Sequence, residues 1–242
     1  MSEKMISQAE QKALVGKVAI DSLIEKGLIF SGMKIGLGTG STAMPAVSRL
    51  AERIKDGTLK DIKAVATSFQ TSIACEELGI PVFSMNAKEI GGKLDLAIDG
   101  ADEINPDKQL IKGGGAALLL EKIVAYNAKT FVIVADSSKT VPSIGTKFAL
   151  PVEIIAEART SVFAALQNLG ASCTLRQGVK KAGPVITDNG NLIADIVWQT
   201  PPDAAKMESK INKIVGVVEN GFFTANKPIV YVAQADGTVK EF

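Results

Sequence analysis

The stretch DGADEINPDKQLIKGGGAALLLEKI, from Asp99 to Ile123, gathers acidic, basic and glycine residues within 25 positions. Asp99 and Asp102 are followed by Lys112, by three consecutive glycines and then by Glu121. For an isolated DGAD segment, a pair of solvated turn acids is the ordinary interpretation, and Lys112 alone would be a surface charge. Here these groups lie beside an apolar strand pattern and the start of an apolar helix pattern. Their role is therefore judged together with the other motifs of the chain.

Glu121 stands in a helix pattern that is apolar on most sides, because it follows Leu118, Leu119 and Leu120. A carboxyl group held against apolar surface is desolvated, which in general raises its pKa and suits a general base working near neutral pH. The alternative is a helix-surface acid paired with a lysine such as Lys122.

The chain contains no histidine. This excludes triads that rely on imidazole and the usual nitrogen-ligated metal sites. Cys75 and Cys173 are too far apart in the sequence for a metal-binding pair and are too few for a disulfide framework, so both are interpreted as small core residues. Proton transfer at neutral pH must then use a carboxylate, a lysine or a cysteine, and we expect no metal.

A second candidate lies in GLGTGST (36–42), between a strand pattern and a helix pattern. Gly38 and Gly40 allow a ligand to approach the backbone, and N–H groups at a helix start can hold an anion to which Ser41 and Thr42 add hydroxyl donors. A dinucleotide fingerprint would require glycine at 41. A tight turn with Ser41 as helix N-cap is the structural alternative, and the motif alone does not decide between them.

Together these groups favour one kind of chemistry. A phosphate cradle, a carboxylate base, a lysine and two further acids suit proton abstraction next to a carbonyl group. The base takes the proton, the ammonium stabilises the oxygen anion of the enediolate, and an aspartate moves the hydroxyl protons.

The surrounding elements predict where these residues meet. Strand patterns that are apolar on both faces alternate with helix patterns, which predicts an α/β fold with a doubly wound, mostly parallel, Rossmann-like sheet. Ligands of such folds bind beyond the carboxyl ends of the strands, and the loops after Gly38, Ile98 and Ala135 all fall there. The expected strands are 33–38, 62–67, 81–85, 93–100 and 129–136.

From about Lys147 the pattern becomes β-α-β-β-α-β, which predicts a smaller, ferredoxin-like α+β domain. We expect a catalytic domain over 1–145 and 225–242, and a small domain over 146–224 that forms subunit contacts. Asn189-Gly190 between two alternating runs indicates a type I′ turn.

Composition indicates an ordinary enzyme. The 242 residues include 27 basic and 26 acidic ones, so net charge gives no case for nucleic acid as a partner. The first residues lack the apolar core of a signal peptide, and no run approaches the length needed to span a membrane. We therefore expect a cytoplasmic protein with no membrane partner.

Four motifs are recognisable together: GLGTGSTA, DGADEIN, KGGGAAL followed by EKI, and ADSSK. In order and spacing they resemble the type A ribose-5-phosphate isomerases, and the likeness extends to LPVEII, RQGV and TDNGN in the small domain. The resemblance implies interconversion of ribose 5-phosphate and ribulose 5-phosphate in the pentose phosphate pathway without a cofactor. It also implies a homodimer or homotetramer.

The resemblance carries roles to individual residues. Glu121 matches the proton-transferring base, and Asp99, Asp102 and Lys112 match groups that bind the sugar hydroxyls, assist ring opening and stabilise the enediolate. The substrate-binding positions are Lys12, Thr39, Gly40, Ser41, Thr42, Gly100, Ala101, Gly113, Gly114, Gly115 and Lys139.

Two other functions compete with isomerisation. A sugar-phosphate sensor or binding domain shares this type of fold, but it would not need Glu121 and normally follows a DNA-binding headpiece. Acyl transfer to coenzyme A uses a glutamate in related folds, but it would leave Lys112 and the aspartates without a purpose. One departure from shorter family members is KKAGP (180–184), which lengthens a hairpin of the small domain and puts the subunit contacts in doubt.

Overall fold

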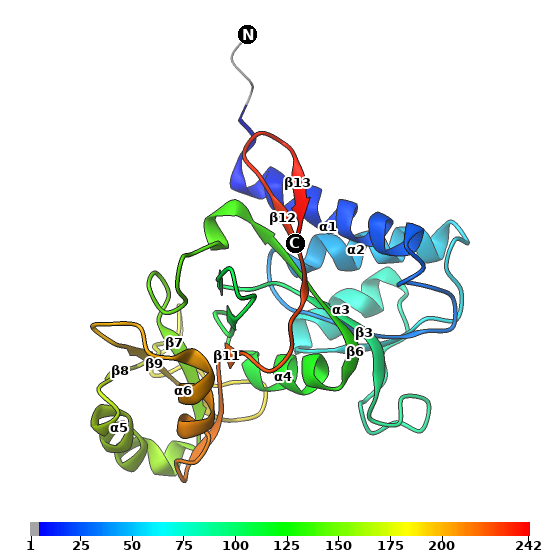
Figure 1. Cartoon of the computed structure of the whole chain (residues 1–242). Coiled ribbons are helices and arrows are strands. Elements are labelled where there is room, and N and C mark those ends of the chain that lie inside the picture. Colours follow the sequence, from blue (N-terminus) through cyan, green and yellow to red (C-terminus); the bar gives the residue numbers. More distant parts are fainter. Residues whose placement is uncertain (1–4) are drawn as a thin grey trace. The chain divides into compact units, whose positions relative to one another are not determined.

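Short apolar strands from the first hundred residues and from two later segments of the chain build a six-stranded sheet (Figure 1). Its order is β13-β12-β6-β3-β1-β2, and every neighbouring pair is parallel except β12 and β13. The predicted doubly wound, mostly parallel sheet is confirmed. The strands are β1 (Lys34–Leu37), β2 (Lys63–Ala66), β3 (Leu94–Asp99), β6 (Ala128–Asp136), β12 (Ile229–Ala233) and β13 (Val239–Glu241).

Local sequence signals set the ends of the helices. A capping box of Ser7 and Glu10 begins α1, and Ser68 caps α3, which ends at Gly79 in the left-handed conformation (φ +73°). The helices are α1 (Gln8–Glu25), α2 (Ala43–Lys55), α3 (Phe69–Leu78) and α4 (Leu118–Tyr126).

Both faces of the sheet are covered. Buried residues of α1 and α2 form one apolar core with alternate residues of the strands, such as Ile35 and Leu37 of β1. On the other face Val124 of α4 approaches so closely that a Cβ at Gly36 would lie 2.2 Å from its Cγ1. Glycine in β1 is therefore required by the close approach of α4.

The structure, a computed structural model, describes residues 5–242 and divides into two compact units. Residues 1–4 of the expected first domain lie outside the described residues. Unit 1 holds the six-stranded sheet and comprises residues up to Gly100, Ile123–Lys139 and Pro228–Phe242. Unit 2 comprises Ala101–Lys122 and Thr140–Lys227, so α4 contributes residues to both units.

Unit 2 contains the predicted β-α-β-β-α-β arrangement. Its four strands are antiparallel in the order β10-β7-β9-β8, and a separate three-stranded sheet has the order β11-β5-β4. The elements are β4 (Glu103–Ile104), β5 (Leu110–Ile111), β7 (Leu150–Ile154), α5 (Arg159–Asn168), β8 (Ser172–Leu175), β9 (Leu192–Val197), α6 (Ala204–Ile211), β10 (Val217–Asn220) and β11 (Phe222–Phe223), with short 3₁₀ turns at Ser137–Lys139 in unit 1 and Ala156–Ala158.

The division of the chain differs from the expected boundaries, because residues 101–122 belong to unit 2. Two sets of hydrogen bonds explain this. Strand β5 pairs with β11, and the buried Glu103 carboxylate accepts the backbone N–H groups of Lys147 at 2.6 Å and Phe148 at 2.8 Å. Such long-range pairing is not visible in a local pattern.

Two local predictions are wrong. The segment 81–85 forms only an isolated bridge between Val82 and Ala64, and Pro81 has no N–H with which a ladder could extend on its N-terminal side. At Asn189-Gly190 only the glycine has a positive φ, of 81°, whereas a type I′ turn needs two such residues. The Thr187 hydroxyl accepts the N–H groups of Asn189 and Asn191 and shapes the turn instead.

Both cysteines are predicted to be core residues. Cys75 is buried, whereas Cys173 is only partly buried. Cys75 is fully buried in the core of unit 1, and burial raises the pKa of its thiol to about 11. Cys173 is half-buried against the core of unit 2, and burial also raises the pKa of its thiol. Among residues 5–242, every helix is too short or too polar to span a bilayer.

The contact of α1 with α2 yields a prediction. A Cβ at Gly16 would lie 2.6 Å from the backbone nitrogen of Ala46, so Gly16→Ala forces the two helices apart. Overpacking costs about 1–3 kcal/mol, which exceeds the gain of up to about 1 kcal/mol that alanine brings to a helix. We expect urea unfolding to show a net destabilisation. The exposed Ala13→Gly variant measures the difference in helix propensity between alanine and glycine alone. A Gly16→Ala protein as stable as the wild type would contradict the packing argument.

Candidate active site

The glycine loop between β1 and α2 contains a residue in the left-handed conformation. Gly40 has a φ of +93°, which residues with a side chain rarely adopt. Thr42 is the N-cap of α2, but its side chain makes no capping hydrogen bond, so the alternative of a tight turn capped by Ser41 is wrong. The Ser41 hydroxyl instead accepts a hydrogen bond from Nζ of Lys12 on α1, at 3.0 Å. The predicted lysine does reach this loop.

The side chain of Asp99 leaves no room for a side chain at Gly38, where the glycine loop begins. Asp99 is the last residue of β3 and only 3% exposed. Its Oδ1 accepts the N–H groups of Thr39 at 3.1 Å and Gly100 at 2.7 Å. A Cβ at Gly38 would lie 2.0 Å from the same oxygen. The carboxylate therefore occupies the space that any side chain at position 38 would need.

A cluster of hydroxyl groups, which the sequence analysis missed, supports the loop from β2 and α3. The Thr39 hydroxyl lies 2.7 Å from the hydroxyls of Thr67 and Ser68, and 3.1 Å from that of Thr71. Thr71 also donates to the carbonyl oxygen of Gly38, at 2.8 Å. The available signal was a run of Ser and Thr directly after a parallel strand, at the sheet edge where the other loops also fall.

Gln70 is a second residue that the sequence analysis missed. Its Oε1 accepts the backbone N–H of Gly40 at 3.1 Å, so an exposed amide oxygen occupies one of the donors of the glycine loop. An anion that uses this N–H must displace the Gln70 side chain.

Lys139 lies in the loop after β6, at the same edge of the parallel sheet as the loops after β1 and β3. The loop is anchored by Asp136, a nearly fully buried residue whose carboxylate accepts the N–H of Ser138 at 3.0 Å and an amide hydrogen from Gln8 at 3.3 Å. The assignment of Lys139 to the substrate site stays a prediction.

In unit 2 the structure pairs the predicted lysine with the predicted base. Nζ of Lys112, directly after β5, lies 3.4 Å from Oε2 of Glu121 in the first turn of α4. The side chains are only 3% and 6% exposed. The alternative of a helix-surface acid paired with Lys122 is wrong, because Glu121 is buried against Lys112.

The second glycine motif repeats the arrangement of the first. Asp102 Oδ2 accepts the N–H of Gly114 at 2.8 Å, and a Cβ at Gly114 would lie 2.7 Å from Asp102 Oδ1. Gly113 has a φ of +103°, and a Cβ there would meet Leu118 at 2.9 Å. Both glycines are required by the geometry of the loop that joins Lys112 to α4.

Arg176 holds this loop from the other side, and the sequence analysis assigned it no role. Its guanidinium donates to the carbonyl oxygens of Gly113 at 2.9 Å and Gly114 at 3.0 Å. The same group forms a two-pronged ion pair with Asp195 on β9. A guanidinium presents its N–H donors in a rigid planar fork, so Arg176 can bind the carboxylate with two nitrogens and the carbonyl oxygens with the third.

The predicted residues are therefore gathered in two groups. Unit 1 holds Lys12, Thr39, Gly40, Ser41, Thr42, Asp99, Gly100 and Lys139, whereas unit 2 holds Ala101, Asp102, Lys112, Gly113, Gly114, Gly115 and Glu121. Gly100 ends a segment of unit 1 and Ala101 begins unit 2, so one covalent connection between the two groups runs through the DGAD motif.

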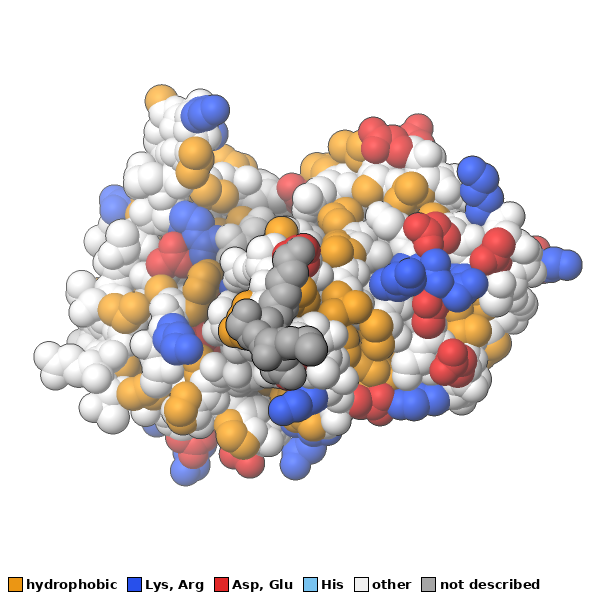
Figure 2. Space-filling model, turned by 90° about the horizontal axis from the view of Figure 1, so that it is seen from above, with side chains coloured by type: hydrophobic (Ala, Val, Ile, Leu, Met, Phe, Trp, Pro, Cys, Tyr) orange, Lys and Arg blue, Asp and Glu red, His pale blue; other side chains and the backbone are white. Residues whose placement is uncertain are grey.

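Charges on the surface give no sign of a polyanion partner on the face that Figure 2 shows. There the basic side chains are interspersed with acidic ones, in keeping with the near-neutral net charge. Within residues 5–242, no group of three or more Asp, Glu or Cys side chains is arranged to hold a metal ion.

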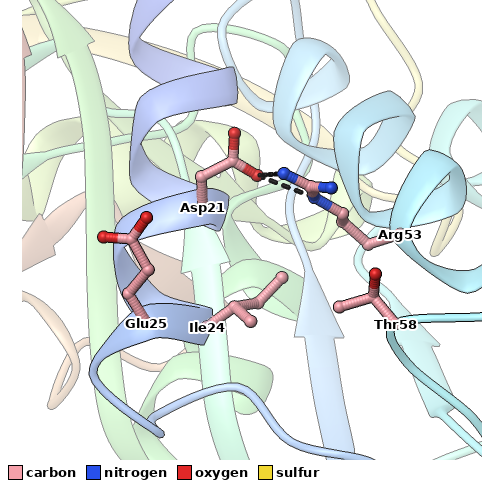
Figure 3. Close-up of a pocket in the computed structure, with 5 residues that line it drawn as sticks. All are labelled: Asp21, Ile24, Glu25, Arg53 and Thr58. Atoms are coloured by element: carbon pink, nitrogen blue, oxygen red, sulfur yellow. Dashed lines mark hydrogen bonds and ion pairs between the residues drawn. The ribbon is translucent and has the colours of Figure 1, made fainter.

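A pocket of about 160 Å³ lies in unit 1 but contains none of the predicted residues. Asp21, Ile24 and Glu25 of α1 line it, with Arg53 of α2 and Thr58 (Figure 3). The Asp21 carboxylate points at Arg53, whereas Glu25 points away. The ion pair between Asp21 and Arg53 already occupies the polar side of this pocket, and we assign it a structural role.

Comparison with known proteins shows the family of this chain. The family model described as Ribose 5-phosphate isomerase A (phosphoriboisomerase A) matches residues 63–237. A Ribose-5-phosphate isomerase A of Treponema denticola is 60% identical over 96% of this chain and 98% of its own length. That of Treponema pallidum is 53% identical over 96% and 92%.

Solved structures agree as well. Ribose 5-phosphate isomerase A of Methanocaldococcus jannaschii is 41% identical, with a TM-score of 0.88 over 98% of this chain and 99% of that one. A D-ribose-5-phosphate isomerase in complex with phospho-erythronic acid is 39% identical, with a TM-score of 0.90 over 98% and 99%. The chain belongs to the ribose 5-phosphate isomerase A family.

The close approach of Gly38 to Asp99 generates a prediction. In Gly38→Ala the new methyl group displaces the Asp99 carboxylate and the Thr39 N–H that it accepts. A misplacement of about 1 Å in a site can cost roughly 10²-fold in rate, and we expect a loss of that order in isomerase assays. Gly57→Ala is the control, because position 57 has a strained φ of +82° but open space around it. Equal activities of the two variants would contradict this role of Gly38.

The Asp21 cluster generates a prediction about pH. Burial alone would raise the pKa of Asp21, but hydrogen bonds and charge from Arg49 and Arg53 outweigh it and lower the pKa below 3.8. A lowered pKa stabilises the fold above the unfolded value and loses that contribution as pH falls through the folded value. We expect Asp21→Asn to lose on the order of 1 kcal/mol at pH 7.

The difference between Asp21→Asn and wild type should shrink in urea unfolding as the pH falls below about 4. The exposed Asp107→Asn variant controls for the loss of a negative charge. A difference that stays constant between pH 7 and pH 3 would show that the ion pairs do not lower the pKa.

Proposed function

We propose that this protein isomerises ribose 5-phosphate and ribulose 5-phosphate without a cofactor, with Glu121 as the proton-transferring base. Membership of the family makes the chain an aldose–ketose isomerase acting on this pair of sugars. The observation that supports the assignment of the base is the buried pair of Lys112 and Glu121, 3.4 Å apart. In this chain, which lacks histidine, the pair joins a carboxylate to a fixed cation.

In the proposed reaction, Glu121 removes the proton from C2 of the open-chain aldose. Negative charge then develops on the oxygen at C1, and the ammonium of Lys112 stabilises it. The resulting enediolate takes the proton back from Glu121 at C1, while the proton of the C2 hydroxyl moves to O1. Because Lys112 is buried, its charge acts in a medium of low dielectric constant, where it is worth more than in water.

Asp99 and Asp102 are the proposed partners of the sugar hydroxyls and of ring opening. Each carboxylate is held by backbone N–H groups through one oxygen, Oδ1 of Asp99 and Oδ2 of Asp102. This fixes the orientation of the carboxylate before the substrate arrives. The backbone of Gly100 and Ala101 and of Gly113–Gly115 is the proposed lining around the sugar.

The proposed phosphate site consists of Thr39, Gly40, Ser41 and Thr42 with Lys12 and Lys139. The left-handed Gly40, the start of α2 and the Lys12 ammonium 3.0 Å from Ser41 all favour an anion. Binding energy from the phosphate would position the reacting carbons against the base.

The solved relative in complex with phospho-erythronic acid supports this division of labour. That ligand combines a phosphate with a carboxylate, whose two oxygens have the planar, anionic character of an enediolate. A sensor without catalysis is not favoured, because it has no use for the buried Lys112–Glu121 pair. Cytoplasmic location, a homodimer or homotetramer, and subunit contacts made by residues 146–224 remain part of the proposal.

The test of the base is Glu121→Gln. The amide keeps the shape of the side chain but cannot take the proton, and general-base contributions are typically about 10² to 10⁴ in rate. We expect a fall in kcat of that size when ketose formation from ribose 5-phosphate is followed in the presence of a chelator.

Glu76→Gln is a matched control, because Glu76 is exposed on α3. Circular dichroism and thermal unfolding check that both variants fold. A Glu121→Gln protein with more than about a tenth of wild-type kcat would show that Glu121 is not the base.

A further inference from the structure

Two buried lysines of unit 2 lie over the same aromatic ring. Nζ of Lys112 is 5.6 Å from the ring centroid of Phe223, and Nζ of Lys122 is 4.9 Å from it. Both lysines and the ring are almost fully removed from solvent. At these distances the negative face of a ring attracts an ammonium, and the attraction is larger where water is excluded.

Lys122 is also held by three oxygen acceptors. Lys122 donates to Glu208 Oε1 at 3.0 Å, to Glu219 Oε1 at 2.9 Å and to the carbonyl oxygen of Asn220 at 2.8 Å. Three oxygen acceptors match the three donors of an ammonium group. Lys122 is therefore a fixed structural cation, next in sequence to the proposed base Glu121 but used for a different purpose.

The position of Phe223 is set by the backbone of the same strand pair that presents Lys112. Phe223 is opposite Leu110 in the pairing of β11 with β5. One residue before the strand, the carbonyl oxygen of Gly221 accepts the N–H of Lys112 at 2.9 Å. Ring and lysine thus belong to one hydrogen-bonded framework.

We propose that Phe223 is a positioning residue for the isomerisation, holding the Lys112 ammonium at Glu121 while Lys122 keeps the ring in place. An aromatic face attracts an ammonium without accepting a conventional hydrogen bond. It can therefore restrict Lys112 in space without itself occupying an N–H group of the ammonium. This inference rests on the proposed function.

The chain supplies a matched control one residue away. Successive residues of a strand point to opposite faces, and Phe222 packs into the core of unit 2, where it stacks on Trp198 with ring centroids 6.2 Å apart. Phe222 and Phe223 are both fully buried phenylalanines of β11, but only the Phe223 ring lies under the two ammonium groups.

The experiment compares Phe223→Leu with Phe222→Leu. We expect Phe223→Leu to lower kcat about 5- to 30-fold, the rate equivalent of one desolvated cation–π contact, with little change in the KM for ribose 5-phosphate. Phe223→Tyr keeps the ring face and should restore most of the rate. Phe222→Leu should lower the thermal stability and leave kcat of the folded enzyme near the wild-type value.

A double-mutant cycle tests whether Phe223 acts through Lys112. In a Lys112→Ala background, Phe223→Leu should cause no further loss of kcat, because the contact is already gone. Losses that add fully in the double variant would overturn the proposal. So would a Phe223→Leu protein whose kcat falls no more than that of Phe222→Leu.

If Phe223→Leu does not fold, Phe223→Met replaces it, since methionine fills irregular core space without a ring face. The same expectations and the same contradicting outcomes then apply. A wild-type protein that fails to isomerise ribose 5-phosphate would refute the proposed function itself. That result is distinct from an active wild type whose Phe223 variants keep full kcat.

Discussion

At two places in this chain an aspartate carboxylate is held against backbone that only glycine can provide. Asp99 occupies the space beside Gly38, and Asp102 occupies the space beside Gly114. Oδ1 of Asp99 accepts the N–H of Thr39 and Oδ2 of Asp102 accepts the N–H of Gly114, so backbone hydrogen bonds help to orient both carboxylates. Glycine is thus required at these positions to make room for the aspartate side chains, whether or not a ligand also approaches the backbone. This constraint accounts for the unusual mixture of charge and bare backbone in the DGAD and GGG motifs.

The buried pair of Lys112 and Glu121 depends on this arrangement. Taking two charges out of water costs several kcal/mol per ion, and their attraction repays that cost only in good geometry. Such a pair is weak evidence for stability but is well suited to chemistry, because each charge is fixed and poorly screened. The loop that joins them is held by Asp102 on one side and Arg176 on the other. Asp102 and Arg176 therefore hold this loop in the fixed geometry that a buried ion pair requires.

In each unit, the residues that hold these loops in place come from elsewhere in the sequence. Thr67, Ser68 and Thr71 place hydroxyl groups under Thr39 from the next strand and helix. Arg176 contacts Gly113 and Gly114 across more than sixty positions of sequence. None of these residues carries a recognisable motif of chemistry. They fix the backbone and the side chains of residues that do carry such a motif. This is the usual division between residues that react and residues that position them.

By itself, the sequence determined the fold class, the family and the identity of the charged and glycine residues, because strand and helix periods, turn residues and four ordered motifs are local properties. It also determined that chemistry must proceed without imidazole. Only the tertiary structure decided that Lys112 faces Glu121 and Lys122 does not, that residues 101–122 belong to unit 2, and that Phe223 lies under both lysines. These outcomes depend on pairing between segments such as β5 and β11, which no local pattern encodes. The direction of a side chain on a short helix follows from what packs against that helix.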